Sequence, residues 1–188
     1  MRREAILPDQ IYHIYNRGIN RQNIFVQKAD YYLFLLKIRK YFAIETAEVL
    51  SYCMMPNHFH LLIYNHCENF GTKIVMPLIT SFTKTLNLKY SREGHLFQGA
   101  YNSKLIDSDE SLMQVSRYIH LNPVKANLVE RPEDWEFSSY LDYIGRRNDS
   151  IVRLEYVMEL FSKTKEYREF VESECEITFD IKKYIFDN

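Results

Sequence analysis

The stretch EVLSYCMMPNHFHLLIYN, residues 48–65, decides the fold because it predicts two strands and the turn between them. Its first part, 48–55, is mostly apolar and contains several residues that favour strands. Pro56 and Asn57 then form a turn dipeptide, and residues 58–65 are again mostly apolar. The pattern predicts a β-hairpin inside an antiparallel sheet.

Five further elements are predicted around this hairpin: a strand over 10–16, a helix over 30–42, a helix over 76–90, a strand over 100–106 and a helix over 107–121. Asp30 is the expected N-cap of the first helix. Asp107 and Glu110 have the spacing of a capping box at the start of the last helix.

The order of these elements is β-α-β-β-α-β followed by a helix, which is typical of the ferredoxin-like fold. We therefore expect an α+β protein with an antiparallel sheet and helices on one face, plus a catalytic helix. A catalytic domain is expected over 1–140. One or two helices over 151–171 would belong to a helical C-terminal extension, 141–188, packed on the core.

The composition favours a globular protein. The chain has 188 residues, of which 46% are hydrophobic, enough to bury a sizeable core. No apolar run reaches the roughly 18 residues of a membrane helix, and the polar start does not resemble a signal peptide. The 3 cysteines form no metal-finger pattern. We expect a cytoplasmic protein that does not enter a membrane.

The net charge of −1 hides an asymmetry along the chain. Residues 1–128 contain 15 Lys and Arg against 10 Asp and Glu, whereas residues 129–188 contain 9 against 15. The first part could supply a basic surface for nucleic acid, although such a modest excess is also ordinary for a soluble surface.

His58 and His60 are the first candidates for chemistry. Residues two apart on a strand project to the same face, so both imidazoles lie together while Phe59 points into the core. Two neutral imidazoles are half of a divalent-metal site, but a lone pair of histidines is more often structural than metal-binding. His66 and Cys67 could extend the set towards zinc, although the spacing matches no zinc signature.

Tyr118 and Asn122 form the second candidate pair. They are four residues apart, so on a helix they share a face. The alternative is that Tyr118 is a half-buried aromatic residue. Asn122 precedes Pro123, so it is also a candidate N-cap of a following helix that begins with proline.

Five stretches carry a family resemblance: HIYNRGINRQNIF (13–25), YCMMPNHFHLLI (52–63), HLFQGAYNSKLI (95–106), YIHLNPVKANLV (118–129) and WEFSSY (135–140). Together they resemble the HUH single-tyrosine transposases, and especially the REP-associated tyrosine transposases. The resemblance covers about residues 10–140. A His-x-His strand followed by Tyr-x-x-x-Asn on a later helix is its most specific part.

The resemblance implies a role for each of these residues. His58, His60 and Asn122 would bind Mg²⁺ or Mn²⁺, and Tyr118 would be the nucleophile. The family cleaves single-stranded DNA beside a hairpin, forms a 5′-phosphotyrosine with a free 3′-OH, and rejoins strands by the reverse reaction. The chemistry agrees, because a tyrosine with an ordinary pKa of about 10 needs a nearby positive charge to attack a phosphate.

Other residues compete for the role of Tyr118. Tyr64, Tyr90 and Tyr101 lie in neighbouring elements, but none of them has Asn or Gln four residues later. Tyr140 is expected to pack near Trp135. His120 falls on a different helix face from Tyr118, so it is expected to be structural or solvent-exposed and is not assigned as the general base.

Seven basic residues are candidates for phosphate contacts: Arg17, Arg21, Lys84, Lys89, Arg92, Lys104 and Lys125. Relatives commonly carry a basic residue where this chain has Ala100. The expected partner is single-stranded DNA with a REP-like hairpin, bound by a monomer or a homodimer. The alternatives are a domesticated hairpin-binding protein without mobility and a ferredoxin-like RNA-binding module.

Overall fold

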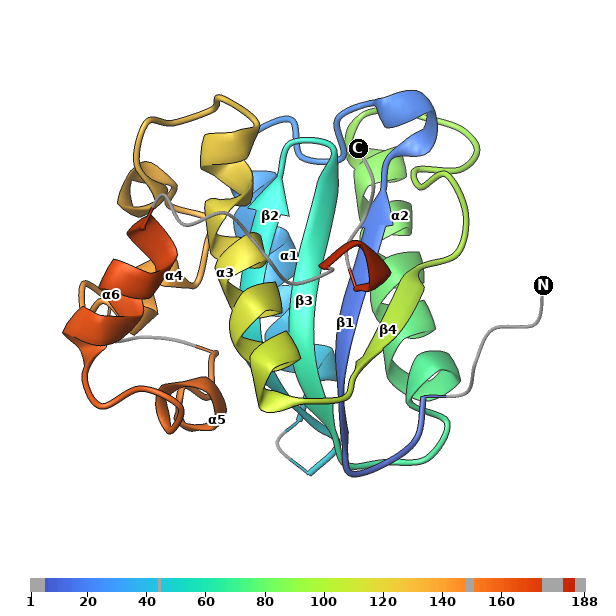
Figure 1. The fold of residues 1–188 in the computed structure, drawn as a ribbon. Coiled ribbons are helices and arrows are strands. Elements are labelled where there is room, and N and C mark those ends of the chain that lie inside the picture. Colours follow the sequence, from blue (N-terminus) through green and yellow to red (C-terminus); the bar gives the residue numbers. More distant parts are fainter. Residues whose placement is uncertain (1–5, 44, 148–150, 174–180, 185–188) are drawn as a thin grey trace.

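Four strands form one antiparallel sheet in the computed structural model, which describes residues 6–43, 45–147, 151–173 and 181–184 (Figure 1). The strands are β1 (Gln10–Arg17), β2 (Ala47–Met55), β3 (His58–Asn65) and β4 (Asn102–Ile106). Their order across the sheet is β2-β3-β1-β4. Both neighbours of β1 run antiparallel to it, so the predicted ferredoxin-like α+β fold is confirmed.

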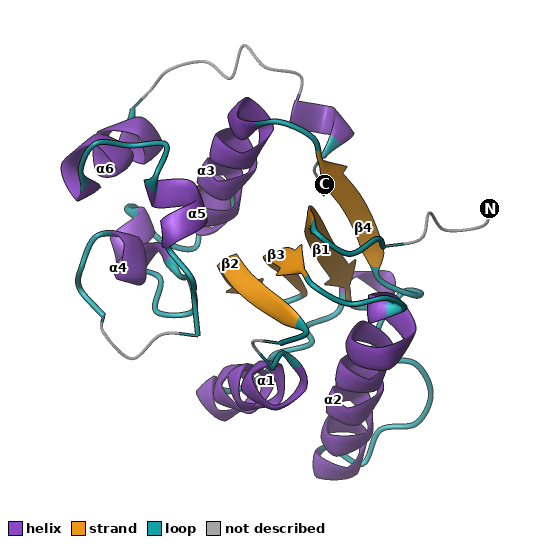
Figure 2. Ribbon diagram, turned by 90° about the horizontal axis from the view of Figure 1, so that it is seen from below, coloured by secondary structure: helices purple, strands orange, loops and turns teal. Residues whose placement is uncertain are grey.

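Helices cover both faces of this sheet. The longer ones are α1 (Lys28–Tyr41), α2 (Met76–Lys89) and α3 (Asp109–Lys125). Figure 2 shows α1 and α2 together on one face, and α3 on the other. Three short helices lie beside α3: α4 (Tyr140–Tyr143), α5 (Glu155–Met158) and α6 (Thr164–Glu172). None of the helices in the described part of the chain is long and apolar enough to cross a membrane.

The alternation of side chains along the strands divides the core into two layers. Phe59 packs against Phe34 of α1, with ring centroids 4.9 Å apart, as the sequence predicted for an inward-facing residue. Leu62, on the opposite face of the same strand, joins Val115 of α3 in the second layer. Because both faces are covered, the central strands β1 and β3 are almost continuously buried.

The starts of two helices differ from prediction. Gln27, and not Asp30, is the N-cap of α1, and the Asp30 carboxylate accepts the Gln27 backbone N–H at 2.9 Å. Asp30 is therefore the third helical residue of a capping box. Ser108, and not Asp107, caps α3, because its hydroxyl accepts the Ser111 backbone N–H at 3.2 Å.

The end of α3 settles the position of Asn122. The helix continues through Asn122 and Pro123 to Lys125, so Asn122 is not the N-cap of a new helix. Proline disfavours helical geometry in the residue before it, but Ile119, Asn122 and Pro123 are all buried. Packing of this face therefore outweighs the local preference.

The described C-terminal residues return to the α3 side of the sheet. The residues 181–184, red in Figure 1, lie in front of the central strands. On the other side of α3, the Tyr167 hydroxyl lies 2.7 Å from His120 Nδ1. His120 is completely buried, so the structural prediction for it is confirmed and the solvent-exposed alternative is wrong.

Candidate active site

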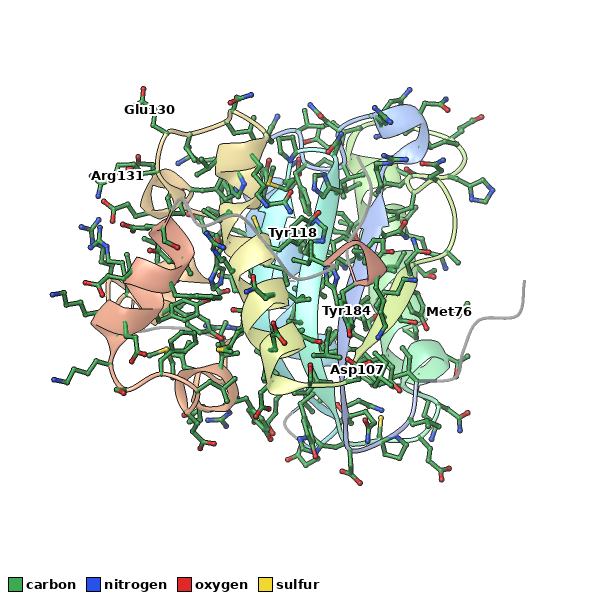
Figure 3. All side chains as sticks on the ribbon, in the orientation of Figure 1. Met76, Asp107, Tyr118, Glu130, Arg131 and Tyr184 are labelled. Carbon is green, nitrogen blue, oxygen red and sulfur yellow. The ribbon has the colours of Figure 1, made fainter. Side chains whose placement is uncertain are left out.

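Strand β3 and helix α3 bring four predicted side chains together. The rings of His58 and His60 lie edge to face with centroids 4.9 Å apart. The Tyr118 ring lies 5.5 Å from that of His60, again edge to face. Asn122 Oδ1 lies 3.2 Å from His58 Nε2. Figure 3 shows Tyr118 on α3, on the side of the sheet where the C-terminal Tyr184 also lies.

The hairpin holds the two histidines in place. His58 is opposite Met55 and His60 opposite Cys53 on β2, so both lie in regular sheet pairing. Phe59 between them is completely buried on the far face. A slip of one residue would exchange this phenylalanine with the imidazoles, and burial of Phe59 therefore sets the register of the site.

The proton on His58 follows from its neighbours. Asn57 Nδ2 donates to the Arg21 carbonyl at 3.3 Å, which turns its Oδ1 towards His58 Nδ1 at 2.6 Å. An amide oxygen only accepts, so Nδ1 carries the proton of a neutral His58. Nε2 then directs a lone pair towards Asn122 Oδ1, and Asn122 Nδ2 is buried without a partner among the described residues.

A third histidine, which the sequence analysis missed, completes the cluster. His13 Nε2 lies 2.9 Å from His60 Nδ1, and His13 Nδ1 lies 2.6 Å from the Tyr184 carbonyl. Its position in the first strand of the sheet, on an alternating pattern, was a usable signal. Tyr15 also lies near the cluster, and its ring is 6.1 Å from that of His60.

Burial keeps these imidazoles neutral. It lowers the pKa of His13 to about 4, against a weaker opposite effect of the Tyr184 carbonyl. It also lowers the pKa of His58 to about 4, where the Asn122 contact acts in the opposite direction. The pKa of His60 falls well below its usual range because of burial first and its two histidine neighbours second.

The unprotonated ring nitrogens of the histidine pair and the amide oxygen of Asn122 suit a cation. His60 Nε2 is buried and has no hydrogen-bond partner in the described part of the chain. The lone pairs of His58 Nε2 and Asn122 Oδ1 face one another at 3.2 Å, an arrangement that a cation between them would stabilise. The described residues contain no group of three or more His, Cys, Asp or Glu arranged for a metal. His66 lies against Glu48 instead, at 2.8 Å, so the zinc alternative with Cys67 is not formed.

Three of the predicted basic residues border this cluster. Lys125 Nζ lies 5.3 Å from the centre of the Tyr118 ring. Arg17 and Arg21 line a cavity of about 490 Å³ together with Asn57 and His58. Burial, and then the positive charge of Arg21, lower the pKa of Arg17. The cavity is therefore a place where an anion would relieve repulsion between two guanidinium groups.

A tight turn builds this cavity. Gly18 donates its backbone N–H to the Asn57 carbonyl at 2.7 Å, and a Cβ at Gly18 would lie only 2.1 Å from the Gln22 carbonyl oxygen. Asn20 and Arg21 both have positive φ, 50° and 59°. The glycine thus allows the turn that places Arg21 beside Asn57.

The other four basic candidates lie apart from the cluster. Lys84 lines a second cavity, of about 580 Å³, between α2 and residues 94–100. Lys89 pairs with the buried carboxylate of Asp30 at 2.6 Å. Arg92 lies 3.5 Å from Gln22 Oε1, and Lys104 is exposed on the edge strand β4.

The competing tyrosines also lie elsewhere. The hydroxyl of Tyr90 donates to Asp30 at 2.7 Å, and that of Tyr140 to Glu172 at 2.7 Å. Tyr64 stacks on Tyr156 with ring centroids 5.0 Å apart. Tyr101 is buried in the layer under α2. Of these candidate tyrosines, Tyr118 is the one beside the histidine pair.

Comparison with known proteins agrees with this geometry. Residues 7–122 match the family model described as IS200-like transposase, and this stretch contains both histidines, Tyr118 and Asn122. The chain belongs to the IS200-like transposase family. The resemblance seen in the sequence is therefore confirmed.

Two relatives of this IS200-like transposase add detail. A Haemophilus influenzae protein assigned as a REP-associated tyrosine transposase is 33% identical over 104 residues, which span 50% of this chain and 58% of that protein. A solved structure of a REP-associated tyrosine transposase bound to a REP hairpin has a TM-score of 0.61 and 17% identity. That match covers 81% of this chain and 89% of the other, and shows a shared fold.

Proposed function

We propose that this protein is a metal-dependent tyrosine nuclease and strand transferase that acts on single-stranded DNA beside a REP-like hairpin. The observation that carries the proposal is the convergence of Tyr118 with His58, His60 and Asn122 from two separate elements. The hairpin bound to the structural relative and the assignment of the Haemophilus influenzae protein support this substrate.

The donor atoms define the proposed metal site. His58 Nε2, His60 Nε2 and Asn122 Oδ1 would hold Mg²⁺ or Mn²⁺, which would supply positive charge beside the scissile phosphate. All three ligands are neutral, so they leave the charge of the ion undiminished. Imidazole nitrogen suits Mn²⁺ better than Mg²⁺, which prefers oxygen.

In the proposed reaction, the Tyr118 oxygen bonds to phosphorus and the bond from phosphorus to the 3′ oxygen breaks. Tyr118 loses its proton to the surroundings, and the departing 3′ oxygen takes one up, which leaves a free 3′-OH. Lys125, near the Tyr118 ring, favours the phenolate that attacks. Attack by a 3′-OH on the phosphotyrosine reverses these bond changes, so rejoining needs no other energy source.

All four side chains come from one copy of the chain. A monomer therefore holds a complete set of nucleophile and metal ligands. Arg17 and Arg21 in the adjoining cavity would contact backbone phosphates of the strand that enters the site. Such contacts position the strand without reading its sequence.

A covalent trapping experiment tests the proposal. Labelled single-stranded DNA that contains hairpins from the source genome is incubated with the protein and Mn²⁺, and adducts are resolved on a denaturing gel. Wild type should form an adduct and Tyr118→Phe should form none. Tyr15→Phe is the matched control, because Tyr15 lies near His60 but has no assigned role, and it should still form the adduct.

The variants separate the alternatives. His58→Ala should lose cleavage and keep much of its DNA binding, whereas unchanged cleavage would remove the metal assignment. Binding of the hairpin by wild type without any adduct would favour a hairpin-binding protein over a nuclease. An adduct in Tyr118→Phe would show that another tyrosine attacks.

A further inference from the structure

The described residues 181–184 reach the candidate site from the end of the chain. Tyr184 is only 3% exposed and its backbone N–H donates to the Ile181 carbonyl at 2.9 Å. Its hydroxyl contacts Ser111 Oγ at 3.0 Å and also bonds to Asp107 at the start of α3. The ring is thus anchored at the base of the helix that carries the nucleophile. This anchor positions the Tyr184 carbonyl oxygen against His13.

The carbonyl determines where protons lie on two histidines. It can only accept, so His13 Nδ1, 2.6 Å away, must carry a proton. A neutral His13 then has its lone pair on Nε2, which lies 2.9 Å from His60 Nδ1. His60 must therefore donate from Nδ1, and its own lone pair is on Nε2. That atom is the one left buried without a hydrogen-bond partner among the described residues.

The alternative arrangement is costly. A doubly protonated His13 would donate to His60 Nδ1, and the proton of a neutral His60 would move to Nε2. His13, whose side chain is 0% exposed, would then carry a buried positive charge. His60 Nε2 would become a buried N–H without an acceptor among the described residues. The neutral arrangement has neither penalty.

We propose that His13 is a positioning residue that fixes His60 in the Nδ1–H tautomer and so presents the Nε2 lone pair to the metal. The proposal rests on the metal site of the proposed function. Metal-binding histidines usually donate their second N–H to a carboxylate, a carbonyl or a water. Here a second imidazole accepts it, and the Tyr184 carbonyl holds that imidazole. The C-terminal segment thereby controls a ligand in the centre of the sheet.

The tautomer can be measured without any variant or metal. In metal-free wild type labelled with ¹⁵N-histidine, long-range proton–nitrogen spectra distinguish protonated from unprotonated ring nitrogens. His60 should show an unprotonated Nε2 and a protonated Nδ1. The opposite pattern would overturn the relay from Tyr184 through His13 to His60.

Two His13 variants then test the effect on the metal. In His13→Gln, the amide can still donate to the Tyr184 carbonyl and accept from His60 Nδ1. In His13→Leu, a side chain of similar size can do neither. Mn²⁺ binding, followed by electron paramagnetic resonance of the free ion, should weaken by about 10–100-fold in His13→Leu and recover largely in His13→Gln. Thermal unfolding of each metal-free variant establishes that it is folded.

The outcomes separate the two proposals. If wild type binds no Mn²⁺, the metal site itself is refuted, whatever the tautomer of His60. If wild type and His13→Leu bind Mn²⁺ equally, the positioning role of His13 is refuted while the metal site stands. Tyr184→Ala removes the ring that anchors the carbonyl, and should weaken Mn²⁺ binding in the same direction as His13→Leu. Unchanged affinity there would show that the C-terminal segment is not needed.

Discussion

Removal of the Tyr167 hydroxyl tests how the C-terminal helix α6 is joined to α3. This hydroxyl lies 2.6 Å from Ser116 Oγ and 2.7 Å from His120 Nδ1, inside the buried core. Ser139 Oγ donates to the Tyr52 carbonyl at 3.2 Å, so it accepts from His120 Nε2 at 2.8 Å. His120 Nδ1 is therefore the acceptor of the Tyr167 proton.

Tyr167→Phe leaves His120 Nδ1 without a donor. Ser116 keeps a partner, because its Oγ lies 3.1 Å from Ser51 Oγ. One buried acceptor left without a hydrogen bond costs about 1–3 kcal/mol. We expect the free energy of unfolding to fall by about 2 kcal/mol, which for a chain of this size lowers the melting temperature by about 4–8 °C.

Urea and thermal unfolding followed by circular dichroism measure this change. Tyr156→Phe is the control, because the Tyr156 hydroxyl bonds Glu48 at 3.2 Å from a half-buried position and its loss should cost less than about 0.5 kcal/mol. Equal stability of Tyr167→Phe and wild type would refute the hydrogen-bonded role of His120. Well below the melting temperature, Tyr167→Phe should still form the DNA adduct, since His120 and Tyr118 project from different faces of α3.

Three further predictions concern charge. Burial lowers the pKa of His13 and His58 to about 4 and of His120 to about 3, and His60 shifts the same way. Below about pH 6.5 the unfolded chain therefore takes up protons that the folded chain does not. Metal-free protein should have its full stability above this pH and lose up to about 1.4 kcal/mol per histidine for each pH unit below it. Equal urea midpoints at about pH 7.5 and 5.5 would contradict this. Replacement of both Arg17 and Arg21 by Gln should weaken hairpin binding. It should also reduce the slope of log affinity against log salt concentration by about 0.7 for each lost single-strand phosphate contact. The control Lys165→Gln, on α6, should leave this slope unchanged. Lys125→Gln should slow adduct formation by about tenfold or more, whereas Lys125→Arg should retain most of the rate because it keeps the positive charge. Equal rates for wild type and Lys125→Gln would exclude a role for this charge.

The order of strands and helices followed from local pattern. The hairpin over 48–65 needed only a turn dipeptide between two apolar runs, and both strands end within one residue of their predicted limits. Local rules failed where packing opposed them. The helix was expected to end before Asn122, and it continues because the residues around Pro123 are buried against the sheet. Cap positions also shifted, because several polar residues near each helix start compete for the same backbone N–H groups.

The sequence by itself determined which side chains share a face: His58 with His60 on a strand, and Tyr118 with Asn122 on a helix. These relations depend only on the periods of 2 and 3.6 residues. The tertiary structure alone decided that the two faces meet, and that His13 joins them through the carbonyl of Tyr184, 171 residues away. Such contacts depend on the order of strands and on the path of the returning chain. No local pattern encodes them, because a hydrogen bond requires atomic positions that only the packed elements define.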